Sequence, residues 1–172
     1  MTPLLANIAD RFQGRPDSEH EQGLVRLGIA TLILSYLGFL GLRYGFNDPK
    51  LMAVFAIMAV ETVLAFGLLV AIALQPGVSV PRRVLGMLGD YFTLAGVMSI
   101  HGRELAPLYI IYLWTTIGNG LRYGATFLLA ATVMACTSFL VVILANSYWQ
   151  SNPYLAWGLF IGLIAIPAYQ ST

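Results

Sequence analysis

The sequence is poor in charge, in histidine and in cysteine. Of its 172 residues, 10% are charged, two are histidine and one is cysteine, whereas 58% are hydrophobic. A soluble domain carries about a quarter charged residues, so this class is excluded. The single cysteine, Cys136, rules out a disulfide within the chain and lies in an apolar run, where a thiol behaves as a small hydrophobic group. The mean hydropathy of +0.77 indicates an integral membrane protein.

Patterns typical of catalysis, metal binding and nucleic-acid binding are also missing. The sequence has no Ser/His/Asp arrangement and no phosphate-binding loop, and Gly118-Asn119-Gly120 fits a helix end better than a phosphate cradle. His20 and His101 are expected on opposite sides of the membrane, which argues against a metal site. The net charge of +1 gives no indication of a nucleic-acid partner. We therefore expect a chain without enzyme activity, metal or cofactor.

Long apolar segments dominate the rest of the sequence. Six of them approach or reach the roughly 20 residues that a membrane-spanning helix requires, and turn-forming residues separate them. The predicted fold class is all-α, a polytopic membrane helical bundle with six transmembrane helices. Five spans remain an alternative, because the third and fourth segments hold polar residues and the sixth is short. The six segments cover residues 18–44, 50–75, 83–101, 104–122, 124–147 and 153–169.

The basic residues predict the orientation in the membrane. With six spans and a cytoplasmic N-terminus, the outside loops contain only Arg43, Lys50 and Arg103. This is the positive-inside bias, and it places both termini in the cytoplasm. Before the first span, residues 1–14 carry apolar groups at helical spacing, which predicts a short amphipathic segment at the bilayer interface or else a frayed tail. The inside residues are Arg11, Arg15, Arg26, Arg82, Arg83 and Arg122.

The only concentrated run of charge stands directly before the first apolar segment. Ser18 and Glu21 have the spacing of a capping box, and the helix dipole favours acidic residues such as Asp17 in this region. Helix capping does not explain Glu19, nor Arg26, which lies about two turns into the apolar helix. We therefore expect a functional role for the surplus charge.

Polar residues inside the predicted spans also need an explanation. Insertion of an unpaired carboxylate at the bilayer centre costs roughly 3 kcal/mol, so such groups face the bundle and find partners. We predict that Glu61 is an inward-facing protonated acid, hydrogen-bonded across helices. For Asp90 and Arg122, structural and ligand-binding roles are both open, and Asn119 lies beside Arg122 in the sequence.

Two motifs resemble the membrane input region of RpfC-type hybrid sensor histidine kinases. They are residues 15–22, which read RPDSEHEQ, and residues 117–124, which read IGNGLRYG. The resemblance covers essentially the whole chain. Members of that family are bacterial receptors for diffusible signal factor, a cis-2-unsaturated fatty acid used in quorum sensing. The resemblance assigns signal sensing to the segment before the first span, which corresponds here to Arg15, Asp17, Ser18, Glu19 and Glu21.

The resemblance also implies partners and a location. It predicts the bacterial inner membrane, a homodimer, and a cytoplasmic kinase module in cis after Thr172. The family is usually described with five spans, whereas the charge distribution here favours six. We divide the chain into residues 1–22, an N-terminal sensing segment and helix cap, and residues 23–172, a transmembrane helical input domain. The expected partners are a fatty-acid signal and the lipid bilayer.

A carboxylate-binding arginine would complete such a receptor. Arg26 and Arg122 are the candidates, because a guanidinium holds a carboxylate bidentately. Without ligand, these arginines are expected to pair with Glu19, Glu21 or Asp90 in one cluster that joins the first, third and fourth helices.

Two other functions remain open from the sequence. The chain could be a small transporter in which Glu61 and Asp90 line a pathway. It could also be a structural membrane anchor and dimerisation domain, in which the polar residues only fix the helix register.

Overall fold

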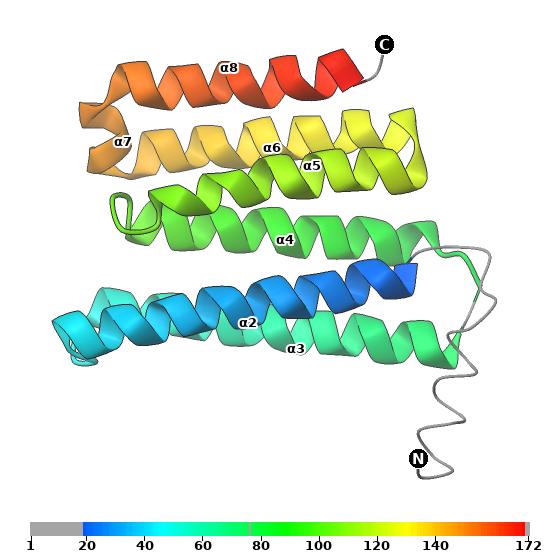
Figure 1. Cartoon of the computed structure of the whole chain (residues 1–172), viewed down its shortest axis with the longest axis horizontal. Helices are drawn as coiled ribbons and strands as arrows, with labels where there is room; N and C mark the ends of the chain where they lie inside the picture. Colours follow the sequence, from blue (N-terminus) through cyan, green and yellow to red (C-terminus); the bar gives the residue numbers. More distant parts are fainter. Residues whose placement is uncertain (1–18, 76, 171–172) are drawn as a thin grey trace, which may run out of the picture.

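The computed structural model describes residues 19–75 and 77–170, and within them it contains helices and no strand (Figure 1). The predicted all-α class is therefore confirmed. The predicted amphipathic segment, with Arg15, Asp17 and Ser18, lies outside the described residues. The elements are α2 (Glu19–Tyr44), α3 (Pro49–Leu74), α4 (Val80–Ile100), η1 (Ala106–Leu108), α5 (Tyr109–Tyr123), α6 (Ala125–Ala145), α7 (Ser147–Ser151) and α8 (Pro153–Gln170).

The long helices match the six predicted apolar segments, with differences at the ends of the third and fourth. α4 begins earlier than predicted, because Pro81 fits the first helical turn. α5 begins later, because Pro107 lies in the short 3₁₀ helix η1 that precedes it. The residues Gly118-Asn119-Gly120 lie inside α5, which continues to Tyr123. The helix ends at Gly124, whose φ of 88° suits glycine.

Four of the helices in the described residues, α2, α3, α6 and α8, are long and apolar enough to cross a membrane. α4 contains two arginines and an aspartate, and α5 has only 15 residues. The structure therefore supports a membrane-embedded bundle. The count of six spans stays a prediction.

α4 lies in the middle of the bundle (Figure 1). The pair α2 and α3 packs on one side of it, and the pair α5 and α6 packs on the other, with α8 outside α6. The start of α2 and the end of α8 lie at the same end of the bundle. The long helices α2, α3, α4, α5, α6 and α8 run alternately in opposite directions, which produces this arrangement.

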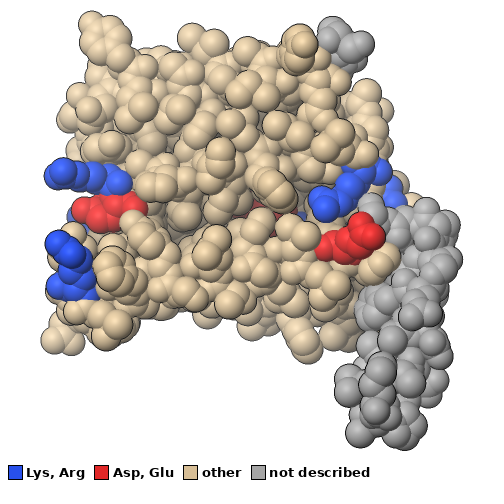
Figure 2. Space-filling model, in the orientation of Figure 1, with Lys and Arg blue, Asp and Glu red and all other residues tan. Residues whose placement is uncertain are grey.

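The surface is apolar between two charged ends. On the face in Figure 2, lysine, arginine and the acidic residues gather at the two ends, and a band nearly free of charge separates them. Large apolar side chains such as Val63, Phe66 and Phe92 are exposed along the helices. Such a band suits contact with lipid tails.

Candidate functional site

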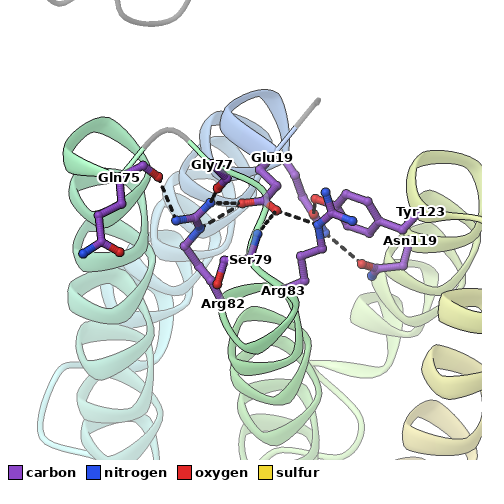
Figure 3. Close-up of polar contacts among 9 residues, drawn as sticks. Glu19, Gln75, Gly77, Ser79, Arg82, Arg83, Asn119 and Tyr123 are labelled. Carbon is purple, nitrogen blue, oxygen red and sulfur yellow. Dashed lines mark hydrogen bonds and ion pairs between the residues drawn. The ribbon is translucent and has the colours of Figure 1, made fainter. Parts of the chain in front are cut away.

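Glu19, the first described residue of α2, is buried against the start of α4 (Figure 3). Its carboxylate accepts a hydrogen bond from Arg83 Nε at 2.6 Å and from Arg82 Nε at 2.8 Å. The backbone N–H of Ser79 lies 3.3 Å from the same carboxylate. We call Glu19, Ser79, Arg82 and Arg83 the Glu19 clamp. A carboxylate that is only 3% exposed is thus held by two guanidinium groups.

The clamp reaches beyond α2 and α4. Arg82 also donates hydrogen bonds to the carbonyl oxygens of Gln75, at 3.1 Å, and Gly77, at 2.7 Å, and so fixes the connection between α3 and α4. The guanidinium of Arg83 lies over the ring of Tyr123 in α5, 4.0 Å from its centroid. Glu19 therefore holds two arginines in place, and these arginines contact the connection between α3 and α4 and the helix α5.

Gln22 joins α2 to α5 one turn further along. Its amide donates to Asn119 Oδ1 at 3.1 Å, and its side-chain oxygen accepts a hydrogen bond from the Tyr123 hydroxyl. Asn119 is fully buried and donates to the carbonyl oxygen of Thr115 at 2.7 Å. The first turn of α2 is thus bonded to both α4 and α5.

Arg26, one further turn along α2, reaches a second polar group. Its Nε lies 2.6 Å from Asp90 Oδ1 and its Nη2 lies 2.7 Å from Oδ2, a bidentate pair between α2 and α4. Glu61 of α3 stands 3.8 Å from the same Nε and accepts a hydrogen bond from Thr93 at 3.1 Å. We call Arg26, Asp90 and Glu61 the Arg26 triad. Glu61 is only 5% exposed, which confirms that it faces inward.

A glycine makes room for the triad. A Cβ atom at Gly86 in α4 would lie 2.7 Å from Arg26 Nη2, so any larger residue would displace the guanidinium. The ion pair between Arg26 and Asp90 therefore depends on the glycine at position 86.

A groove runs between α2 and α5, with α3 and α4 as its floor. It has a volume of about 580 Å³, counted to its open mouth. Apolar side chains form most of its length, Trp114 lies at its exposed rim, and the Arg26 triad lines its inner part. The lining residues include Val25, Ile29, Ala30, Ile33, Met58, Leu94, Ile111, Thr115, Gly118 and Arg122.

Arg122 is the second cation of this groove. Within residues 19–75 and 77–170 it forms no ion pair or hydrogen bond, and its guanidinium lies over Gly118, where a Cβ atom would be 3.3 Å from Nη1. The groove therefore carries a guanidinium available to an anion next to an apolar channel.

The predicted single charge cluster is wrong in its partners. Arg26 pairs with Asp90, one of the three acids expected as its partner, but Glu19 pairs with Arg82 and Arg83, for which only a role in membrane orientation was predicted. Glu21 is exposed and makes no contact with Arg122 within the described residues.

The physical reason is helix geometry. Glu19, Gln22 and Arg26 follow one another at spacings of three and four residues, so they share the inward face of α2, whereas Glu21 points away. This spacing was visible in the sequence. The pairing of Glu19 with Arg82 and Arg83 was not, because it depends on how α4 packs on α2.

The described residues contain no group of three or more His, Cys, Asp or Glu side chains that could hold a metal ion. His20 lies in the first turn of α2 and His101 follows α4, at opposite ends of the bundle.

The fold and the polar contacts define a membrane-embedded helical domain whose first helix is held by buried charge. No family model matches the chain, and no solved structure matches it. The chain is, however, 50% identical over 160 residues to the sensory/regulatory protein RpfC from each of two strains of Xanthomonas campestris pv. campestris. The similarity covers 92% of this chain and 22% of each relative.

The chain is therefore RpfC-like over nearly its whole length, which confirms the resemblance of its two motifs. It spans about a fifth of the length of these relatives. The similarity supports a role as the sensory part of a signalling protein.

Proposed function

We propose that this chain is the membrane signal-input domain of a two-component sensor histidine kinase. Its signal is a cis-2-unsaturated fatty acid of the diffusible signal factor type, and it controls a kinase module that follows Thr172. The protein lies in the bacterial inner membrane as a homodimer with both termini in the cytoplasm. The similarity to RpfC supports the class, and the groove between α2 and α5 supports the chemistry of the ligand.

The two arginines of the groove differ in whether they already have an acidic partner. Asp90 already occupies two N–H groups of Arg26, whereas Arg122 has no acidic partner among the described residues. A guanidinium matches a carboxylate with two parallel hydrogen bonds. The fatty-acid carboxylate therefore binds Arg122 in this proposal.

The acyl chain then lies between α2 and α5. From Gln22 to Ile33 the groove follows α2 over about 16 Å at the helical rise, and its walls there include Val25 and Ile29. This length and these side chains suit a medium-length hydrocarbon. The open side lets the ligand enter from the bilayer.

The signal passes to the rest of the bundle through the first turn of α2. A carboxylate at Arg122 lies one residue from Tyr123, which bonds Gln22 and stacks on Arg83. Ligand binding changes how this turn rests on α5, and the Glu19 clamp transmits the change to α4. Such a switch needs a ligand that binds one arrangement more tightly than the other. Arg15, Asp17, Ser18 and Glu21 keep their proposed sensing role.

The direct test is fatty-acid binding to the purified chain in lipid nanodiscs. Arg122→Gln should weaken the binding of a twelve-carbon cis-2-unsaturated fatty acid by about tenfold or more, because a hydrogen bond to a charged group is lost. Arg103→Gln, an exposed arginine at the other end, is the matched control and should bind normally. Equal affinity of both variants would contradict the proposal.

Two other functions predict different results. A transporter that uses Glu61 and Asp90, which both line the groove, would move a labelled solute into vesicles. A structural anchor would give no ligand-dependent output when fused to a reporter kinase. Uptake in the first assay, or a silent chimera in the second, would replace the sensor proposal.

A further inference from the structure

With Glu61 ionised in the ligand-free state, and not protonated as expected from the sequence, the charges that line the groove balance before any ligand enters. Arg26 and Arg122 contribute two positive groups, and Asp90 and Glu61 contribute two acids. A fatty-acid carboxylate would add one more negative charge to a site away from bulk water. The cost of buried charge is then lowest if one acid in the groove becomes neutral.

Of the two acids, Glu61 has the weaker contacts to groups that stabilise a negative charge. Asp90 receives both hydrogen bonds from Arg26, while Glu61 stands 3.8 Å from the same guanidinium. Its Oε2 accepts one hydrogen bond, from Thr93, and its buried Oε1 has no hydrogen-bond partner in the described residues.

The groups that face Glu61 are known from every helix around it. Arg26 lies on α2, Asp90 and Thr93 lie on α4, and Arg122 lines the same groove from α5. A Cβ atom at Gly89 would lie 3.0 Å from Glu61 Oε2, so α4 leaves just enough space for the carboxyl group. Oε1 lies 3.8 Å from Arg26 Nε, beyond hydrogen-bond distance, so an added proton on Oε1 displaces no hydrogen bond.

We propose that Glu61 takes up one proton from solvent when a fatty-acid carboxylate binds Arg122. The inference rests on the proposed function and adds to it a regulation by pH. The proton neutralises Glu61, which has the weaker contact with Arg26, so the charges in the groove still balance when the ligand is bound. Because binding takes up a proton, the affinity for the fatty acid is higher at low pH. Uptake of one proton changes this affinity by at most about tenfold per pH unit.

Titration calorimetry in two buffers of different ionisation enthalpy counts the protons taken up on binding. The probe is the twelve-carbon cis-2-unsaturated fatty acid, added to the purified chain in nanodiscs of zwitterionic lipid. We expect close to one proton for the parent protein in the pH range where Glu61 titrates. Glu61→Gln, which is neutral at every pH, should bind the acid with no uptake of its own.

Two controls separate Glu61 from the ligand and from other acids. Glu104→Gln makes the same chemical change at the opposite end of the bundle and should keep the parent proton count. The primary alcohol with the same chain carries no negative charge, so its binding should be independent of pH. Any protonation of the fatty acid itself is common to all variants and cancels in the comparison.

A second variant keeps the test valid if Glu61→Gln folds poorly. Thr93→Val removes the hydrogen bond to Glu61 Oε2, and this bond favours the charged form. The pH dependence of binding should then move to higher pH. Equal proton uptake by the parent and Glu61→Gln, or an unmoved pH dependence in Thr93→Val, would overturn the inference and leave fatty-acid binding intact. Absence of binding by the parent at every pH would instead overturn the proposed function together with it.

Discussion

Two seams of the bundle are built from different chemistry. Where α2 meets α4 and α5, the contacts are ion pairs and amide hydrogen bonds through Glu19, Gln22 and Arg26. Where α4, α5 and α6 meet, the contacts are aromatic: Tyr91 stacks on Tyr112 at 6.0 Å between ring centroids. We call these the polar seam and the aromatic seam.

The aromatic seam is a continuous chain of ring contacts without ion pairs among the described residues. The ring of Phe139 in α6 lies 5.6 Å from Tyr112 and 5.3 Å from Tyr109, and Trp149 of α7 packs edge-on against it at 5.3 Å. The Tyr109 hydroxyl also donates to the carbonyl oxygen of Leu159 in α8, at 2.6 Å. Such packing gives no discrete alternative partners.

The polar seam differs because its partners can be exchanged. Lipid tails are as apolar as helix surfaces, so packing and interhelical hydrogen bonds, rather than hydrophobic burial, hold membrane helices together. A ligand anion competes with a carboxylate for a guanidinium but not with one aromatic ring for another. In the proposed sensor, the aromatic seam is the fixed part of the bundle and the polar seam around α2 is the part that responds to the signal.

The largest effect is expected at the Glu19 clamp. Glu19→Ala leaves two buried arginines without their shared carboxylate, and breaking a buried ion pair costs about 3 to 5 kcal/mol. Thermal unfolding in detergent measures it. Glu21→Ala, in the same turn but exposed, should change little; equal stability of the two variants would contradict the clamp.

A substitution in the aromatic seam should lower stability without changing the affinity for the fatty acid. Phe139→Ala removes the ring in contact with three aromatic neighbours and should cost about 3 kcal/mol by cavity formation. The folded fraction should still bind the fatty acid with parent affinity, because the ring does not line the groove. If fully folded Phe139→Ala bound the fatty acid more weakly than the parent protein, the two seams would not differ in function.

Glu61 should show an intermediate effect on stability. Glu61→Gln keeps the size and the hydrogen bond with Thr93 and should be tolerated. Glu61→Ala removes the acceptor of that bond and should lower stability by about 1 to 3 kcal/mol. Equal unfolding temperatures of the Ala and Gln variants would show that the buried carboxyl group has no structural role.

The smallest effect concerns the contact between α2 and α5. A double-mutant cycle with Gln22→Ala and Tyr123→Phe should give a coupling energy of about 1 kcal/mol, because the two side chains share a hydrogen bond. A parallel cycle with Glu21→Ala and Arg122→Gln should give none, since the structure separates these residues. Coupling in the second cycle and additivity in the first would restore the single-cluster hypothesis.

The sequence was sufficient for features that depend on local pattern. Apolar length predicted the long helices, and the cost of charge in lipid predicted that Glu61 faces inward and that Arg26 pairs with an acid, with Asp90 as one of three candidates. It was not sufficient for the partner of Glu19, because Arg82 and Arg83 approach it only through the packing of α4 on α2. The hydrogen bond between Gln22 and Asn119 likewise depends on the packing of α5 against α2.

Photolabelling tests the central claim, a fatty acid in the groove between α2 and α5, most directly. The probe is the twelve-carbon cis-2-unsaturated acid with a diazirine at its methyl end, and mass spectrometry locates the label. The groove model predicts label near Ile33 and Ile111, strongly reduced in Arg122→Gln and unchanged in Arg103→Gln. Label confined to exposed lipid-facing residues such as Val63 and Phe66, or equal labelling in both variants, would contradict it.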